Sequence, residues 1–176
     1  HAKAINFGIL YGMGVTALKD SMGVDRKTAQ EFYDAYKVRF SILMNYLEDT
    51  KEFARTHGYV ETLFKRQRQV PLIKSQIPFM RAQGERIAIN APIQGTSADI
   101  LKIGMIDVYN YLQENNSSAK IILQIHDELV LETDTDDNST ALEVKSILEN
   151  VLSKRGKSIV PLVVGVKEGQ SLYDLK

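Results

Sequence analysis

The chain has 176 residues, of which 44% are hydrophobic and 25% are charged, an ordinary composition for a globular protein. It has no cysteine, which excludes a disulfide framework and thiolate chemistry. No run approaches the roughly 18 apolar residues of a membrane helix. We therefore expect a cytoplasmic protein without a membrane partner. Because the chain begins with His1 instead of Met, we also expect it to be part of a longer polypeptide.

The zero net charge is unevenly distributed along the chain. Residues 1–102 hold 15 Lys and Arg against 10 Asp and Glu, a net of +5, whereas residues 103–176 hold 7 against 12, a net of −5. A basic surface can bind phosphates and an acidic one can bind metal ions. Uneven solvation of two lobes explains the asymmetry equally well.

The first third of the sequence predicts four helices, over residues 2–11, 15–22, 25–40 and 41–57. Glycines follow the first, second and fourth of these segments, where they can end a helix. Asp25 is a suitable N-cap for the third helix, and Ser41 can cap the fourth.

The rest of the sequence predicts a mixture of helices and strands. Residues 59–71 favour a short hairpin or loop, and residues 79–113 a long helical stretch interrupted near Pro92 and Gly95. A turn at 115–118, strands at 120–124 and 128–132, a helix at 135–154 and a strand at 158–166 follow. Helices followed by a strand–strand–helix–strand unit predict an α+β fold, with a helical lobe beside a small antiparallel sheet.

Lys3, Phe7 and Tyr11 form the first candidate site. Their spacing of four residues confines them to about 80° of one helix face. An ammonium group beside two aromatic rings suits a nucleoside triphosphate, because the cation can contact phosphate and the rings can contact base or sugar. The alternative is an amphipathic helix whose aromatic residues fill a core.

Arg86, Asn90 and Gln94 repeat the same spacing further along the chain. Every base pair presents hydrogen-bond acceptors in the DNA minor groove, so donors of this kind can check the geometry of a pair without reading its sequence. Alternatively, Asn90 and Gln94 satisfy exposed backbone groups at a kink near Pro92.

His126, Asp127 and Glu128 separate two apolar strands. Two adjacent carboxylates at a hairpin turn favour a hard cation such as magnesium, whereas one His beside an Asp is a weak zinc signal. A solvated polar turn is the alternative. Asp134 would lie about 23 Å along an extended strand, at roughly 3.3 Å per residue, which is too far to share a metal with Asp127.

Several runs resemble motifs of family A DNA polymerases, in the order of the family. KAINFGILYG is similar to the fingers-helix motif Arg-x3-Lys-x3-Phe/Tyr-x3-Tyr-Gly. RIAINAPIQGTSADILK resembles the stretch beneath the primer–template end, and the His-Asp-Glu triplet matches the palm motif. Residues 58–70, GYVETLFKRQRQV, resemble the family run GYVETLFGRRR. Their basic side chains Lys65, Arg66 and Arg68 could hold DNA phosphates, and a solvated loop is the alternative.

The resemblance implies roles for individual residues. Lys3 would contact the incoming triphosphate, Phe7 would pack by its sugar, and Tyr11 would guard the templating position. Asp127 would bind metal, Glu128 would lie close to the metals, and His126 would lie near the primer terminus. Magnesium, as two ions in the complete site, is the implied cofactor.

The resemblance also implies the architecture and the reaction. Residues 1–92 would be a mostly helical part of the fingers, and residues 93–176 part of the antiparallel palm sheet with its helices. The reaction would be template-directed addition of deoxynucleotides to a primer 3′ end in DNA replication or repair, with primer–template DNA and deoxynucleoside triphosphates as partners.

Two family features are not found in this sequence. The fingers arginine would precede His1, and the Asp-Tyr-Ser run that carries the other catalytic aspartate does not occur. We therefore expect an inactive fragment that needs an upstream polymerase segment, in cis or in trans. One half of a split polymerase and a non-catalytic nucleic-acid-binding remnant are the alternatives.

Overall fold

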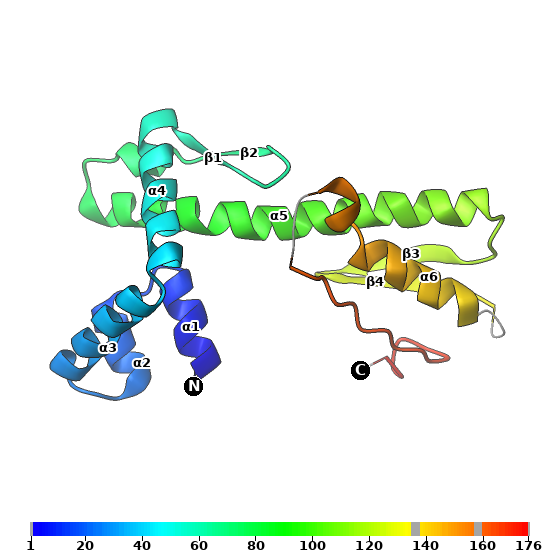
Figure 1. The fold of residues 1–176 in the computed structure, drawn as a ribbon, viewed down its shortest axis with the longest axis horizontal. Coiled ribbons are helices and arrows are strands. Elements are labelled where there is room, and N and C mark those ends of the chain that lie inside the picture. Colours follow the sequence, from blue (N-terminus) through cyan, green and yellow to red (C-terminus); the bar gives the residue numbers. More distant parts are fainter. Residues whose placement is uncertain (1, 135–137, 157–159, 176) are drawn as a thin grey trace. The chain divides into compact units, whose positions relative to one another are not determined.

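The computed structural model describes residues 2–134, 138–156 and 160–175 (Figure 1). The chain divides into two compact units, His1–Thr96 and Ser97–Lys176. This division falls slightly beyond the boundary after residue 92 that the sequence suggested. The predicted α+β class is confirmed, since helices predominate beside two antiparallel hairpins. None of the helices in the described ranges is both long and apolar enough to cross a membrane.

Four helices open the first unit, as predicted: α1 (Ala2–Leu10), α2 (Val15–Met22), α3 (Arg26–Arg39) and α4 (Ser41–His57). Gly23 and Gly58 end α2 and α4 with φ of 68° and 82°, the left-handed conformation that glycine adopts without strain. Ile9, Leu18 and Tyr36 form a small buried core where α1, α2 and α3 meet.

The predicted caps of α3 and α4 have different outcomes. Asp25 caps α3, because its side chain accepts hydrogen bonds from the backbone N–H groups of Lys27 and Thr28. The prediction that Ser41 caps α4 is wrong: Phe40 is the N-cap and Ser41 is the first helical residue. Phe40 ends α3 and starts α4 at once, donating its N–H to Tyr36 while its carbonyl accepts from the Met44 N–H. No position is left between the helices for a capping side chain.

A short hairpin, β1 (Tyr59–Glu61) and β2 (Gln67–Gln69), follows α4 and leads into a 3-10 helix, η1 (Pro71–Lys74). The strands are antiparallel, with Val60 opposite Arg68. The hairpin, η1 and the neighbouring helices enclose the second core of this unit, formed by Ala54, Val60, Val70, Ile73 and Ala88.

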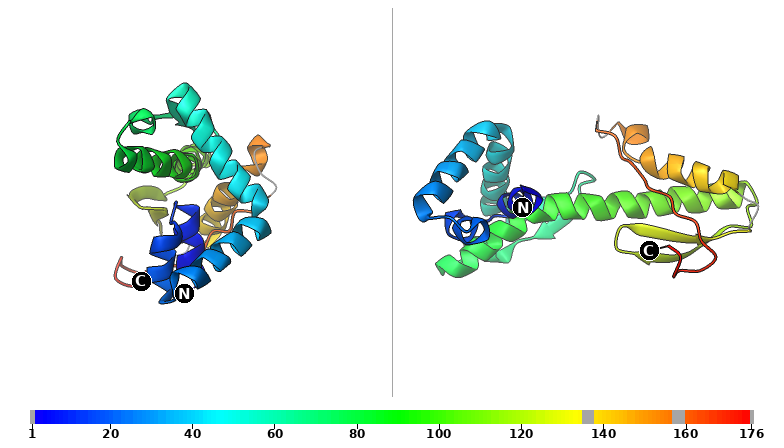
Figure 2. Two further views of the ribbon diagram at one scale, coloured as in Figure 1. Left: turned by 90° about the vertical axis from the view of Figure 1, so that its left-hand side faces the viewer. Right: turned by 90° about the horizontal axis from the view of Figure 1, so that it is seen from below.

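The long helix α5 (Pro78–Glu114) is continuous, as the right-hand view of Figure 2 shows, so the interruption predicted near Pro92 and Gly95 is wrong. Proline removes one hydrogen-bond donor from a helix. Here Pro92 is buried, and the preceding residues Ala88 and Ile89 are packed in the interior. This packing stabilises the helix across the proline.

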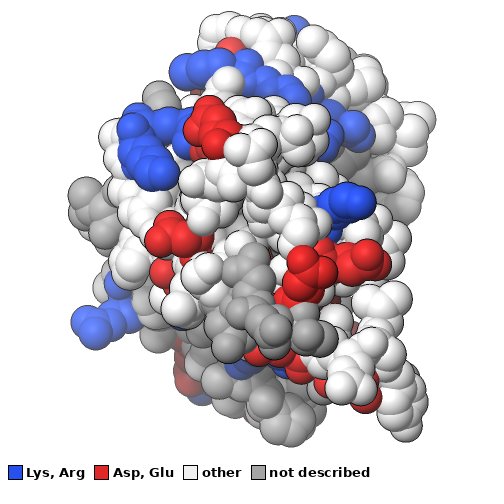
Figure 3. All heavy atoms as spheres, turned by 90° about the vertical axis from the view of Figure 1, so that its right-hand side faces the viewer, with Lys and Arg blue, Asp and Glu red and all other residues white. Residues whose placement is uncertain are grey.

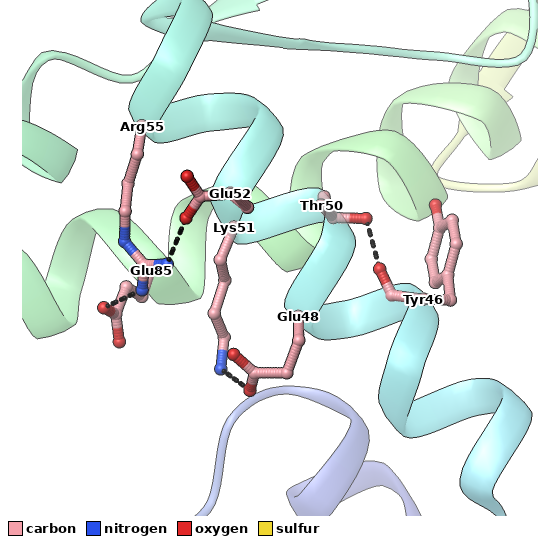
Figure 4. A network of polar contacts seen from close by, with 7 residues as sticks. All are labelled: Tyr46, Glu48, Thr50, Lys51, Glu52, Arg55 and Glu85. Atoms are coloured by element: carbon pink, nitrogen blue, oxygen red, sulfur yellow. Dashed lines mark hydrogen bonds and ion pairs between the residues drawn. The ribbon is translucent and has the colours of Figure 1, made fainter.

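Arg55 joins α4 to α5 within the first unit (Figure 4). Its guanidinium donates to Glu85 at 2.8 Å and to Glu52 at 3.1 Å, and these hydrogen bonds raise the pKa of Arg55. Both partners of the Arg55–Glu85 pair are partly exposed, so its effect on stability is modest. The pair fixes α4 against the part of α5 that bears Arg86.

The second unit contains the C-terminal part of α5, the hairpin β3 (Lys120–Ile125) and β4 (Glu128–Glu132), α6 (Asn138–Glu149) and η2 (Ser153–Arg155). The two strands and their junction at His126 and Asp127 are confirmed. α6 is shorter than the predicted helix over 135–154, and residues 135–137 lie outside the described residues. The core of this unit comprises Val108, Leu112, Ala119, Val144 and Ile147.

The predicted strand at 158–166 is wrong for residues 160–166, which form no strand; residues 157–159 lie outside the described residues. The backbone N–H of Val164 donates to the Glu149 side chain at 2.9 Å. Val160 and Val163 are 70% and 84% exposed. The valines of this segment indicate strand propensity, but a strand also requires a neighbouring backbone to pair with.

A candidate nucleic-acid interface

Lys3 and Phe7 lie on one face of α1, and Tyr11 follows in the turn directly after this helix; these three residues are called the α1 face. The rings of Phe7 and Tyr11 stack with centroids 6.0 Å apart, and the Lys3 ammonium lies 5.8 Å from the Phe7 ring centroid. Phe7 is 46% exposed, so it does not fill a core. The structure thus provides an accessible cationic and aromatic face, and its use by a triphosphate stays a prediction.

Gly12 brings the end of α1 against α5. Its φ of 89° is left-handed, and a Cβ at this position would lie 3.0 Å from Cγ of Arg86 and 3.4 Å from Cδ1 of Ile89. A larger residue would therefore be strained both by the backbone and by the contact. The close approach makes the turn that ends α1 and the side chain of Arg86 neighbours within the first unit.

A groove of about 590 Å³ lies between the β1–β2 hairpin and α5. Its lining residues include, from α5, the predicted set Arg86, Asn90 and Gln94, and from the hairpin Arg66 and Arg68. The remaining residues that line it are Val60, Glu61, Thr62, Gln83, Ile87, Ala91 and Gly95. Two sets of residues that were predicted separately thus share one concave surface.

Lys65, the third basic residue predicted for this hairpin, does not line the groove. It is 81% exposed, and its ammonium pairs with Glu61 at 3.0 Å. Hydrogen bonds from Lys65 and Gln67 lower the pKa of the Glu61 carboxyl. Glu61 is the one acidic residue among those that line this groove, and its carboxylate forms an ion pair with the ammonium of Lys65.

Asn90 has a side-chain oxygen that is buried and, within the part of the chain that the structure describes, has no hydrogen-bond partner. Buried polar atoms are normally paired, so an orphaned acceptor in the wall of a groove calls for an explanation. Because this oxygen has almost no accessible surface, a ligand in the groove could pair with it only after the side chain rotates. Amide oxygen and nitrogen can exchange places by a flip, so Asn90 can serve either as acceptor or as donor.

Sequence reasoning missed Thr62, Gln83 and Thr96 in and beside this groove. Thr96 accepts a hydrogen bond from the backbone N–H of Leu63 at 2.9 Å, and so joins α5 to the hairpin. This contact links positions that are 33 residues apart. No local pattern in the sequence could have indicated it.

His126 and Asp127 form the two-residue turn between β3 and β4, and Glu128 begins β4. His126 has a φ of 54°, its carbonyl accepts a hydrogen bond from the Gln124 side chain at 3.2 Å, and all three side chains are exposed. The described residues contain no group of three or more His, Asp or Glu side chains that could hold a metal ion. The metal-binding role of Asp127 and Glu128 therefore stays a prediction.

The charges separate by unit. Residues 1–96 hold 14 Lys and Arg against 9 Asp and Glu, a net of +5, and residues 97–176 hold 8 against 13, a net of −5. On the face drawn in Figure 3, small groups of cationic and anionic side chains, some of them side by side, lie among uncharged ones. The groove, with three arginines, lies within the basic unit.

The family model for DNA polymerase family A matches residues 1–174, and the chain belongs to this family.

Among individual proteins, the chain is 46% identical over 176 residues to DNA polymerase I of Caldicellulosiruptor bescii and 45% identical over 170 residues to DNA polymerase I of Pseudomonas aeruginosa. It spans about a fifth of the length of these relatives, 20% and 18%, while they match 99% and 97% of this chain. Among solved structures it resembles the POL domain of Pol1 from M. smegmatis in complex with DNA primer-template and dNTP. That likeness has a TM-score of 0.80 and 33% identity, and covers 85% of this chain and 26% of the other.

Proposed function

We propose that this chain is the fingers and palm portion of a DNA-directed DNA polymerase, which adds deoxynucleotides to a primer 3′ end under the direction of a template. The observation that carries the proposal is the groove that Arg66, Arg68 and Arg86 line together with Asn90 and Gln94. This donor set suits primer–template DNA. The complex of the M. smegmatis relative with primer-template and dNTP adds support from a homologous fold.

The chemistry of the groove matches what a polymerase must recognise. Guanidinium groups bind DNA phosphates without regard to sequence. Asn90 and Gln94 can contact the acceptors that every base pair presents in the minor groove. A polymerase needs this combination, because it must bind any correctly paired primer end.

The α1 face would bind the incoming deoxynucleoside triphosphate. Lys3 would contact its phosphates, Phe7 would pack against its sugar, and Tyr11 would lie at the templating position. The contact of Gly12 with Arg86 supports this assignment, because it places the residue that follows Tyr11 against an arginine that lines the groove.

Asp127 and Glu128 would hold magnesium, and His126 would lie near the primer terminus. Two adjacent, exposed carboxylates at a hairpin turn fit the preference of magnesium for oxygen ligands. Magnesium bound there would supply Lewis-acid chemistry, favouring loss of the proton from the primer 3′-hydroxyl and stabilising negative charge on the departing pyrophosphate. We propose that a further carboxylate comes from polypeptide outside these 176 residues, in cis or in trans.

Binding of a primer–template duplex by the 176-residue chain tests the groove. Fluorescence anisotropy would give the Kd at several salt concentrations for the wild type and for Arg68→Ala, Arg86→Ala and the control Arg26→Ala. Arg26 is exposed at the start of α3 and does not line the groove. Each groove variant should bind more weakly and lose about 0.9 of the slope of log K against log salt, while the control keeps both. Equal effects of all three substitutions would contradict the proposal.

Primer extension with magnesium and four deoxynucleotides tests catalysis. The chain would be assayed alone and with a second polypeptide that carries the Asp-Tyr-Ser run. We expect extension only in the mixture, and none when Asp127→Ala replaces the wild type. Absence of extension in both, with the second polypeptide folded, would favour the non-catalytic binding remnant.

A further inference from the structure

The tip of the β1–β2 hairpin, residues 62–66, is folded by Thr62. This threonine is 6% exposed. Its hydroxyl accepts hydrogen bonds from the backbone N–H groups of Phe64 and Arg66, at 3.3 and 3.2 Å. The backbone of Thr62 also pairs with Lys65 and Arg66. The local shape of the tip therefore depends on contacts within the tip itself.

A second set of contacts joins this tip to α5. The Thr96 hydroxyl donates to the Pro92 carbonyl at 2.6 Å and accepts from the Leu63 N–H at 2.9 Å. The Arg66 guanidinium donates to the Gly95 carbonyl at 3.0 Å. The tip is thus attached to one turn of the helix, next to Gln94, which lines the groove.

Gly95 permits this attachment by its lack of a side chain. A Cβ at this position would lie 2.6 Å from Cγ2 of Thr62 and 3.3 Å from the Arg66 guanidinium. Thr62 is buried and β-branched, so it has little freedom to move aside. The hairpin tip and α5 therefore approach more closely than any other residue at position 95 would allow.

We propose that Thr96 is a positioning residue for DNA binding: its hydroxyl fastens the hairpin tip to α5 and so holds Arg66 beside Asn90 and Gln94. The inference rests on the proposed function, because it assumes that the groove binds DNA. Thr62 already folds the tip, so the Thr96 contact adds only the placement of the tip against the helix. An arginine whose direction is fixed before binding loses less conformational freedom when it meets a phosphate.

A double-mutant cycle in the 176-residue chain tests this role, with Kd and salt slope measured on a primer–template duplex. Thr96→Val and Arg66→Ala should each weaken binding roughly tenfold, the loss typical of one hydrogen bond to a charged group. Each should also lower the salt slope by about 0.9, as expected for one lost phosphate contact. The double variant should bind no more weakly than Arg66→Ala alone, and Thr96→Ser should bind like the wild type.

Thr50→Val is the matched control. The Thr50 hydroxyl donates to the Tyr46 carbonyl within α4 at 2.7 Å (Figure 4), as the Thr96 hydroxyl donates to the Pro92 carbonyl within α5. Thr50 does not line the groove. This variant should keep the wild-type Kd and salt slope. Gly95→Ala displaces the tip by steric contact and should reproduce the effect of Thr96→Val. Circular dichroism would show that all variants are folded at the assay temperature.

Hydrogen exchange of the backbone amides in the hairpin tip gives a measurement that does not depend on DNA. Exchange of the Leu63 amide, which donates to the Thr96 hydroxyl, should accelerate in Thr96→Val and remain unchanged in Thr50→Val. Unaltered exchange, or losses of affinity from Thr96→Val and Arg66→Ala that simply multiply, would overturn the positioning role. If Arg66, Arg68 and Arg86 can all be replaced without loss of binding, the DNA groove itself is wrong, even where exchange at the tip responds to Thr96.

Discussion

Lys65, at the tip of the β1–β2 hairpin, has a φ of 67°, in the left-handed region that side chains with a Cβ disfavour. The family run that this segment resembles has glycine at the corresponding position, and glycine adopts this conformation without steric cost. Lys65 is mostly exposed, and its ion pair with Glu61 is of the kind that contributes little to stability. The left-handed conformation of Lys65 therefore lowers the stability of the fold, whereas its ion pair raises the stability slightly.

Lys65→Gly should stabilise the chain by about 0.5–1 kcal/mol, because relief of the left-handed strain outweighs the ion pair and the added freedom of the unfolded chain. Lys65→Ala is the control, because it loses the same ion pair and keeps the strain. Urea unfolding of both variants and the wild type would give the free energies. A glycine variant no more stable than the alanine variant would show that the tip is not strained at Lys65.

At the scale of single residues, the sequence was informative where chemistry repeats along one helix. A spacing of four residues separates Arg86, Asn90 and Gln94, so the prediction of a helix is enough to place them on one face. Thr96 and Leu63 meet only because the hairpin folds back on α5. A contact between distant segments leaves no period in the sequence, and so the attachment of Arg66 required the structure.

At the scale of elements, the N-terminus of α3 depends on a charged cap. The carboxylate of Asp25 accepts hydrogen bonds from the backbone of Thr28 and Lys27 and from the Thr28 hydroxyl. These bonds lower the pKa of Asp25 below its ordinary value of 3.8, with Thr28 as the largest cause. A carboxyl whose pKa is lower in the folded state stabilises that state above the unfolded pKa. The stabilisation is lost as the pH falls through the folded pKa.

We expect Asp25→Asn to reduce the pH dependence of stability, because asparagine keeps a capping oxygen but does not titrate. Asp25→Ala should lower the Tm at neutral pH, since it removes the cap. The measurement is the Tm by circular dichroism from about pH 6 to about pH 2, compared with the wild type, since other carboxyls titrate in the same range. Equal pH dependence in the wild type and Asp25→Asn would mean that the cap is not charge-dependent.

Element boundaries were predictable where they depend on a local signal. Gly23, Gly58 and Asp25 mark helix ends through backbone conformation or a capping side chain, and each acts at the predicted place. The failures depend on tertiary packing. Pro92 lies inside α5, where its neighbours are buried. Residues 160–166 have no strand beside them in the described part of the chain, and the Val164 N–H bonds to the Glu149 side chain instead.

At the scale of the whole molecule, each described core draws its residues from a single unit. Ile73 belongs to the core around the β1–β2 hairpin, and Leu112 to the core beneath β3, β4 and α6. They are 1% and 2% exposed. Burial of apolar side chains is the main source of stability. Separate cores therefore predict that the two units lose their protection against hydrogen exchange independently.

Ile73→Ala and Leu112→Ala form a matched pair, because each should lower the free energy of unfolding by about 2–5 kcal/mol through lost burial and the cavity that remains. Hydrogen exchange followed by mass spectrometry would report on both units in one experiment. Ile73→Ala should accelerate exchange in α4 and the β1–β2 hairpin, and Leu112→Ala in β3, β4 and α6. Within α5, residues 78–96 should follow the first unit and residues 97–114 the second. Acceleration of both units by either substitution would mean that the chain unfolds as one cooperative body, with the continuous helix α5 coupling its two cores.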